Sequence, residues 1–119
     1  MPLNKNDFLI NKKDSEITRN LKLNPPHKIS IEIINDTKIN ISKTNDSMTT
    51  SLINRIVKKG EKFNFNFLSI INFEFLNGND LIVKLNDYSI NELLKIKSLA
   101  IRGSYEVSKS QLYISFYNY

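Results

Sequence analysis

The sequence contains no cysteine and no tryptophan, and its 119 residues include only three glycines and one histidine. Without cysteine, neither a disulfide nor a thiolate metal site can form. His27 cannot make an imidazole pair for zinc, and its place after Pro25 and Pro26 is typical of a loop histidine. Three glycines also argue against a phosphate-binding loop and a nucleophile elbow. We therefore expect no metal and no other cofactor.

Long hydrophobic runs are missing as well. No stretch approaches the roughly 18 apolar residues of a membrane-spanning helix. The opening segment MPLNKNDFLINKKDSE has no cleavable apolar core, and Asp7, Asp14 and Glu16 are unusual for an acid-poor import helix. We therefore expect no membrane partner, and a chain that works in an organelle would be made inside it.

Positive charge is in excess. Seventeen Lys and Arg face twelve Asp and Glu, which gives a net charge of +5. That balance favours a polyanionic partner, because Lys and Arg near phosphates release condensed counterions. Ordinary solubility charge is the alternative, and the net charge alone does not separate the two.

Residue usage is biased toward AT-rich codons. The chain has seventeen Asn and seventeen Ile but a single Ala. This bias is typical of a protist mitochondrion, a plastid remnant or a reduced bacterium. Lys then replaces Arg, and Ile or Asn replaces Ala, so that family motifs are expected to look eroded.

Alternating patterns predict strands in two parts of the chain. In residues 28–42, isoleucines alternate with polar residues on both sides of Asn35–Thr37, which indicates a hairpin. Residues 1–46 as a whole are expected to form an N-terminal extension. Near the C-terminus, residues 96–101 are β-rich, residues 102–104 form a break, and Tyr113, Ser115 and Tyr117 alternate with Ile114 and Phe116, which predicts a second hairpin within residues 95–119.

The middle of the chain favours helix. In SLINRIVKKG, residues 51–60, Leu52, Ile53, Ile56 and Val57 fall at helical spacing, and Gly60 stands where a left-handed C-cap belongs. Residues 61–76 fit a strand through alternating Phe and Asn, or a buried helix about as well. Residues 77–80 predict a turn. Residues 81–94 fit a strand and a short helix, or one helix.

Cations and tyrosines recur in two groups that suit structured RNA. Lysines and arginines can contact phosphates, and exposed aromatic rings can stack on unpaired bases. The alternative is a solvated lysine face with tyrosines covering a sheet edge. The candidate RNA-binding residues are Arg55, Lys58, Lys59 and Lys62 in the first group, and Lys95, Lys97, Arg102, Tyr105 and Lys109 in the second.

A catalytic alternative rests on Tyr105 and Lys109. Their Tyr-x-x-x-Lys spacing occurs in single-tyrosine DNA-nicking enzymes, where the tyrosine is the nucleophile. Such enzymes also need two histidines to hold a metal, and this chain has one. No carboxylates are paired for acid and base roles. We expect a binding protein and no enzyme; a small interaction protein of a virus or plasmid is a further alternative.

Two segments together resemble the bacterial-type small-subunit ribosomal protein seven. SLINRIVKKGEK, residues 51–62, is similar to that family's first helix, which runs into a glycine flanked by lysines. KIKSLAIRGSYEV, residues 95–107, is similar to its Val-Lys-Ser stretch, glycine pair and Tyr-Gln-Val at the start of a β-hairpin. Arg102 replaces one glycine, and the family's prolines in the third-helix region and after the hairpin's Tyr-x-Val are absent.

The resemblance implies an α+β fold, with a mostly helical core over residues 47–119, a helix at Phe63–Leu76 and a protruding C-terminal β-hairpin. It implies a structural role in the small ribosomal subunit, binding head-domain rRNA and neighbouring head proteins. Lys58, Lys59 and Lys62 would contact rRNA after the first helix, and Lys97, Arg102 and Tyr105 at the hairpin base. Gln111 and Tyr113 would lie toward mRNA and the exit-site tRNA.

The family's C-terminal helices have no counterpart here. Either a separate polypeptide supplies them through a split gene, or the protein is pared down. With the codon bias, this predicts an organelle-encoded mitochondrial ribosomal protein, with the cytoplasm of an AT-rich bacterium as the alternative location.

Overall fold

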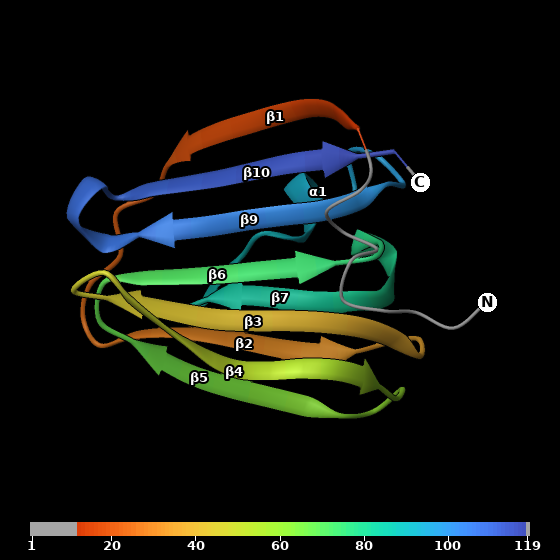
Figure 1. The fold of residues 1–119 in the computed structure, drawn as a ribbon, viewed down its shortest axis with the longest axis horizontal. Coiled ribbons are helices and arrows are strands. Elements are labelled where there is room, and N and C mark those ends of the chain that lie inside the picture. Colours follow the sequence, from red (N-terminus) through yellow and green to blue (C-terminus); the bar gives the residue numbers. More distant parts are fainter. Residues whose placement is uncertain (1–11, 119) are drawn as a thin grey trace.

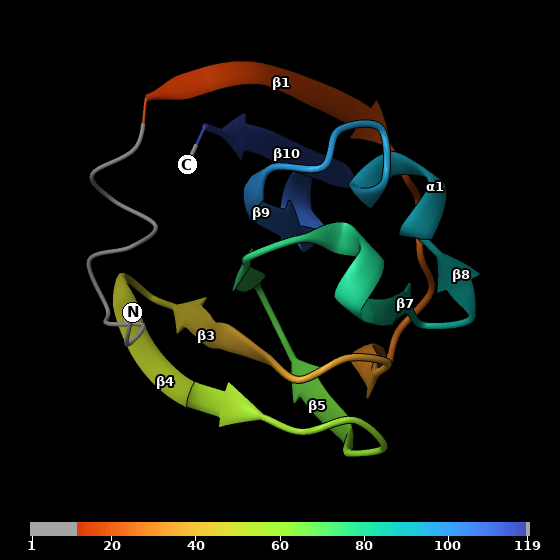
Figure 2. The same ribbon diagram turned by 90° about the vertical axis from the view of Figure 1, so that its right-hand side faces the viewer.

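The computed structural model describes residues 12–118, which form two antiparallel β-sheets packed face to face (Figure 1). Viewed from the side, the sheets form two layers, and the short helix α1 (Asn91–Leu94) lies at their margin (Figure 2). The larger sheet has six strands in the order β1 (Lys13–Asn20), β10 (Gln111–Tyr117), β9 (Ala100–Glu106), β6 (Ile70–Phe75), β3 (Thr37–Asn45) and β4 (Met48–Val57).

The smaller sheet has four strands. Two short helical segments connect strands of different sheets, and a third connects β9 to β10 within the larger sheet. The strand order is β5 (Lys62–Phe67), β2 (His27–Ile33), β7 (Leu81–Leu85) and β8 (Tyr88–Ser89). The helical segments are η1 (Gly78–Asp80), α1 (Asn91–Leu94) and η2 (Val107–Lys109).

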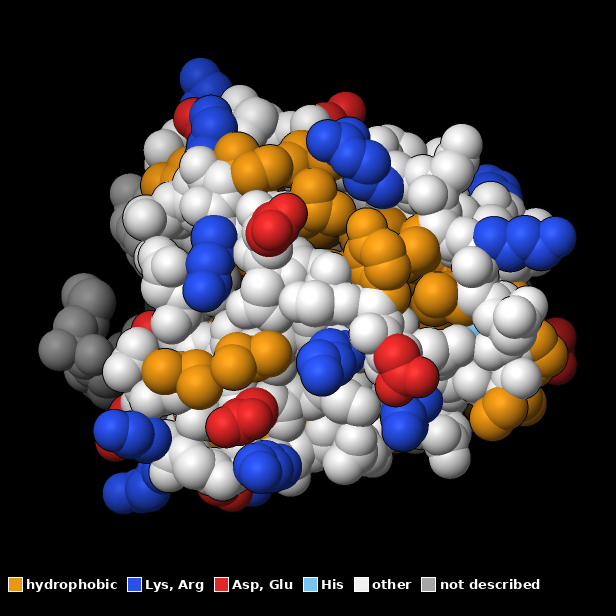
Figure 3. Space-filling view, turned by 180° about the vertical axis from the view of Figure 1, so that it is seen from behind, with side chains coloured by type: hydrophobic (Ala, Val, Ile, Leu, Met, Phe, Trp, Pro, Cys, Tyr) orange, Lys and Arg blue, Asp and Glu red, His pale blue; other side chains and the backbone are white. Residues whose placement is uncertain are grey.

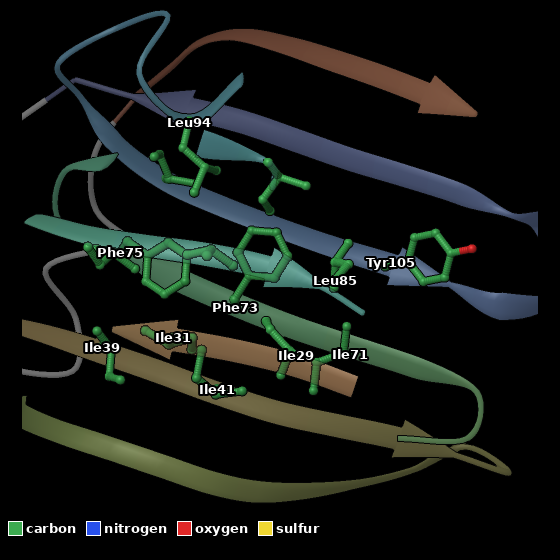
Figure 4. Packing of buried hydrophobic residues seen from close by; sticks show 14 of the residues in the cluster. Ile29, Ile31, Ile39, Ile41, Ile71, Phe73, Phe75, Leu85, Leu94 and Tyr105 are labelled. Atoms are coloured by element: carbon green, nitrogen blue, oxygen red, sulfur yellow. The ribbon is translucent and has the colours of Figure 1, made fainter. Parts of the chain in front are cut away.

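The core lies between the sheets, because each strand turns alternate side chains inward. Ile29 and Ile31 of β2 face Ile39 and Ile41 of β3, and Phe73 extends from β6 among them (Figure 4). All five are at most 2% exposed. Leu94 of α1 and Leu85 of β7 close the same core. The alternating hydrophobic residues of the sequence therefore form the core of a β-sandwich.

The expected helical core is wrong. The two antiparallel sheets contain most of the described chain, and its only α-helix is α1, four residues long. Residues 51–60, expected as a helix, belong mainly to β4. The pairing of β3 with β4 shifts between Ile41 and Ser42, which leaves Leu52 as an extra residue of a bulge. Leu52 and Ile53 are consequently both half-buried, and this imitates helical spacing.

The helix implied for Phe63–Leu76 is also wrong. This segment forms β5 and β6, joined at Leu68–Ser69, and the two strands belong to different sheets. The alternation of Phe63, Phe65 and Phe67 with asparagine was thus the relevant signal. Gly60 has the positive φ expected of it, 94°, although it lies in a turn between strands and not at a helix end.

The prediction for residues 28–42 is correct for the two strands and wrong for their pairing as a hairpin. Strands form on both sides of residues 34–36, but β2 and β3 do not pair, because the chain crosses there from one sheet to the other. A C-terminal hairpin forms as β9 and β10, with Tyr105 opposite Leu112, but the break expected at residues 102–104 is wrong, because these residues lie inside β9 and the turn is η2. It does not protrude, since β6 and β1 pair with its two outer edges.

Strands before and after residue 46 share the same sheets. β3 pairs with β4 across the expected boundary, and β1 pairs with β10 from the other end of the chain. Residues 1–11 of the expected N-terminal extension lie outside the described residues.

Candidate nucleic-acid interface on the four-stranded sheet

The outer face of the four-stranded sheet is built from the polar positions of three alternating strands. In β2 the isoleucines point into the core, so Lys28, Ser30 and Glu32 point outward. In β5 the outward positions are Lys62, Asn64 and Asn66. In β7 they are Ile82 and Lys84. The strands bring these side chains onto one surface although they come from three separate parts of the sequence.

Strand register arranges these side chains in rows. Ser30 lies between Asn64 and Lys84, and its hydroxyl donates a hydrogen bond of 2.8 Å to the Asn64 Oδ1 atom. Lys28 lies beside Asn66, and Glu32 lies between Lys62 and Ile82. A shallow groove of about 160 Å³ follows the rows from Lys84 to Lys62.

A larger hollow of about 610 Å³ opens at the end of this face, beside Lys22, Lys28, Asn66 and Tyr88. Asn86 lines this hollow and connects the two chain segments around it. The Asn86 side chain accepts a hydrogen bond of 2.9 Å from the Lys28 backbone N–H and donates one of 2.9 Å to the Asn24 carbonyl. These bonds join the β7–β8 turn to the segment before β2. They hold Tyr88, which is 51% exposed, at the rim of the hollow.

We name this surface the basic strip. It joins the groove and the hollow across the four-stranded sheet, with Lys28 lining the hollow and Lys62 and Lys84 lining the groove. Successive same-face residues on a strand lie roughly 7 Å apart, so Lys28 and the row of Lys62 are separated by roughly 13 Å. The strip consists of Lys22, Lys28, Lys62, Lys84, Asn64, Asn66 and Tyr88.

The four lysines of the strip have no ion-pair partner among residues 12–118. Glu32 and Asp87 are the acidic residues that line the two depressions, so positive charge exceeds negative charge there. Figure 3 looks onto this side of the molecule and shows separate basic side chains spread over it, with acidic side chains between them. The strip can therefore accept anionic groups without first breaking an ion pair.

The first group of predicted RNA-binding residues gathers around the β4–β5 turn. Arg55 Nη2 lies 3.0 Å from Glu61 Oε1, and the Lys58 backbone N–H donates to Glu61 Oε2 at 2.7 Å. The hydrogen bonds from Arg55, and then that from Lys58, hold the pKa of the Glu61 carboxyl below its usual value. Lys59 is exposed in the same turn. Of this group, only Lys62 belongs to the basic strip.

The second group is dispersed. Lys95 follows α1, and Lys97 forms an ion pair of 2.5 Å with Asp14, which lowers the pKa of that carboxyl. Arg102 lies on the six-stranded sheet and pairs with Glu74 at 3.0 Å. Lys109 lies in η2, 4.0 Å from Glu106. The structure does not bring these cations together with the first group.

The tyrosines expected to contact RNA have other partners. Tyr105 is 1% exposed, and its hydroxyl donates a hydrogen bond of 2.5 Å to the Leu21 carbonyl. The nucleophile required by the nicking alternative is therefore in the core. Tyr113 lies on β10 and donates to Glu16 at 2.5 Å, while Lys13 donates to the Tyr113 hydroxyl at 2.9 Å. Gln111 begins the same strand, half-buried.

Sequence reasoning missed most of the strip. The alternation that predicted a strand at residues 29–33 also placed Lys28, Ser30 and Glu32 on one outer face, and it could have indicated a polar surface there. No sequence signal joins that strand to Lys84 or Tyr88, because this depends on the pairing of β2 with β7.

Within residues 12–118, no group of three or more His, Asp or Glu side chains is placed to hold a metal ion. No helix of that part of the chain is long and apolar enough to cross a membrane. Comparison with protein-family models, with curated proteins and with solved structures gives no match to this chain.

Proposed function

We propose that this protein binds single-stranded nucleic acid, specifically RNA, along the basic strip. The observation that carries the proposal is the set of four lysines without ion-pair partners in the described chain, three on the outer face of the four-stranded sheet and Lys22 at its end, beside the exposed ring of Tyr88. Lysines supply sequence-independent attraction to phosphates. An exposed ring at the end of the strip offers a surface on which one base can stack.

The remaining side chains of the strip suit bases and sugars. Asn64 and Asn66 are exposed on β5, and amide groups can both donate to and accept from base edges. A strip that spans roughly 13 Å between lysine rows fits a segment of a few nucleotides and offers no deep groove for a duplex. The function is thus binding and positioning, without catalysis.

Within this proposal, ribosomal RNA is the target that the sequence resemblance favours. The choice of small-subunit head rRNA rests on the sequence resemblance of residues 51–62 and 95–107, and the geometry of the strip does not depend on it. The helical scaffold that the resemblance implied is replaced by a β-sandwich, so the strip takes the place of the residues carried over from the family.

The test is titration of a fluorescein-labelled single-stranded RNA with the protein, followed by fluorescence anisotropy. The double variant Lys28→Gln/Lys84→Gln removes two charges from the strip, and Arg19→Gln removes one charge from the outer strand β1 of the other sheet. We expect the double variant to bind at least about tenfold more weakly and Arg19→Gln to bind like the wild type. Equal losses per charge in the two variants would show that binding follows net charge and not the strip.

A further inference from the structure

The outer face of the six-stranded sheet carries a second and chemically different site. A groove of about 380 Å³ crosses the middle strands β3, β6, β9 and β10. Its centre is lined by short polar side chains, because Ser42, Asn72, Ser104 and Tyr113 are aligned across four neighbouring strands. The row beside it consists of Asn40, Glu74, Arg102 and Ser115.

The charged groups beside this groove are paired. Arg102 Nε donates to Glu74 Oε2 at 3.0 Å, and Asn40 Nδ2 donates to Glu74 Oε1 at 2.6 Å. The Arg102 guanidinium also lies over the Tyr117 ring, 5.3 Å from its centroid. An anionic ligand against Arg102 would meet the Glu74 carboxylate as well. The groove therefore differs from the basic strip and favours an uncharged ligand.

Hydrogen-bonding capacity in the groove is not exhausted. The Arg102 side chain is 38% exposed, and within residues 12–118 only its Nε atom makes a hydrogen bond, so the exposed part of the guanidinium can still donate, although Nη2 itself is shielded from solvent. Asn72 Nδ2 donates to Ser42 Oγ and Thr44 Oγ1 at 3.3 and 3.1 Å, so the Asn72 carbonyl oxygen can still accept. The Ser104 hydroxyl has no partner among the described residues and can both donate and accept.

We propose that this groove binds a neutral polyhydroxylated ligand, namely one or two saccharide residues. Each hydroxyl of a sugar both donates and accepts, and the groove offers a guanidinium donor, an amide acceptor and a serine hydroxyl within neighbouring rows. The Tyr113 side chain at one wall can cover the apolar face of a sugar ring. A volume of about 380 Å³ is at the small end of ligand sites, which limits the ligand to this size.

The experiment is an NMR titration of the ¹⁵N-labelled full chain. The probes are glucose, galactose, mannose and N-acetylglucosamine at millimolar concentration, with glucuronate and inorganic phosphate as anionic comparisons. We expect at least one neutral sugar to shift the backbone amides of Ser42, Asn72 and Ser104 and the side-chain amide of Asn72 in a saturable way. The anions should leave these signals in place.

Variants then locate the site. Ser104→Leu places a larger side chain in the centre of the groove and keeps the Arg102–Glu74 pair, and we expect the apparent affinity for the sugar to fall at least about tenfold. Ser108→Leu, in exposed η2, is the matched control and should bind like the wild type. The unfolding temperature and RNA affinity of each variant verify that the sandwich and the opposite face are intact.

Two results would overturn the proposal. One is the absence of saturable shifts in the groove with all four neutral sugars. The other is a response to phosphate or glucuronate alone, which would make the groove an anion site. Neither result bears on RNA binding, because the basic strip lies on the other sheet and is measured with a different probe.

Discussion

The Tyr105 hydroxyl donates a hydrogen bond of 2.5 Å to the carbonyl oxygen of Leu21, a residue 84 positions earlier in the chain. The Leu21 backbone N–H in turn donates to the Ser110 carbonyl at 2.7 Å. The two bonds fasten the connection between β1 and β2 to the β9–β10 hairpin. Tyr105 also packs against Phe67, with ring centroids 6.2 Å apart, so a single side chain joins the core to this connection.

A variant that lacks only the Tyr105 hydroxyl measures how much this hydrogen bond contributes to the free energy of unfolding. We expect Tyr105→Phe to lower the free energy of unfolding by about 1 kcal/mol, since the ring stays packed while the Leu21 carbonyl loses a donor. Urea unfolding followed by circular dichroism gives this value. Tyr113→Phe is the control, because its hydroxyl bonds to exposed Glu16 and its loss should cost less. Equal costs at the two positions would contradict the anchoring role of Tyr105.

Gly103 and Phe73 are packed in direct contact inside the six-stranded sheet. A Cβ atom at Gly103 would lie 2.4 Å from two atoms of the Phe73 ring, too close without movement of a fully buried side chain. We expect Gly103→Ala to destabilise the protein by about 1–3 kcal/mol through overpacking. In Gly103→Ala/Phe73→Leu the ring contact is removed, while the Tyr113 carbonyl oxygen 2.9 Å from the new Cβ atom remains, so the double variant should recover part of the loss and be more stable than the sum of the single effects implies.

Gly60 provides the contrast to Gly103. No atom of residues 12–118 lies within 4 Å of a Cβ atom built there, so the cost of a side chain comes from its φ of 94°. We expect Gly60→Ala to cost about 1 kcal/mol of backbone strain. Thermal unfolding of both glycine variants separates strain from overpacking, because only Gly103→Ala should be rescued by Phe73→Leu. Rescue of Gly60→Ala by the same change would contradict this assignment.

The comparison of sequence and structure shows which signals are local. Alternation at Ile29–Ile33 and at Tyr113–Tyr117 predicts strands correctly. A strand that is buried on one face has hydrophobic residues at every second position, and this pattern is visible in the sequence. β4 does not show this alternation. It is a mostly exposed outer strand with a bulge at Leu52, and its buried positions therefore do not recur at every second residue. Its β-branched residues Ile53, Ile56 and Val57 were the better guide.

Long-range pairing explains the rest. Residues 34–36 carry the chain from one sheet to the other, whereas a hairpin turn would return it within the same sheet, and no local residue pattern distinguishes these outcomes. The basic strip likewise needs β2 between β5 and β7, and the polar groove needs β6 between β3 and β9. The charged residues could be found in the sequence, but their neighbours could not, because cross-strand partners depend on the fold.

Glu61 makes stability depend on pH in the acid range. Its pKa is lowered in the folded state by hydrogen bonds from Arg55 and from the Lys58 backbone. As the pH falls, the unfolded chain therefore binds a proton at Glu61 first, near its ordinary pKa of about 4.3. The contribution of Glu61 to stability is complete above that pH and is lost as the pH falls through the lower folded pKa.

The matching measurement compares the wild type with Glu61→Gln in urea at a series of pH values. We expect the wild type to be the more stable protein at neutral pH, with the difference shrinking in the acid range as Glu61 is protonated. Salt should shrink it too, because the pair is exposed. A difference that does not change with pH would show that the carboxylate charge has no part in holding the β4–β5 turn.

Tyr88 and Lys28 border the same hollow but should contribute to RNA binding in different ways. We expect Tyr88→Ala to weaken binding of a single-stranded RNA by about 1–3 kcal/mol through loss of base stacking, and Tyr88→Phe to keep most of the affinity. Neither change removes a charge, so the slope of log affinity against log salt should stay at its wild-type value. Lys28→Gln should reduce that slope by about 0.7, as expected for one lost phosphate contact on a single strand. A change of the slope in Tyr88→Ala, or an unchanged slope in Lys28→Gln, would contradict the assignment of base stacking to Tyr88 and phosphate contact to Lys28. RNA would then not lie along the strip.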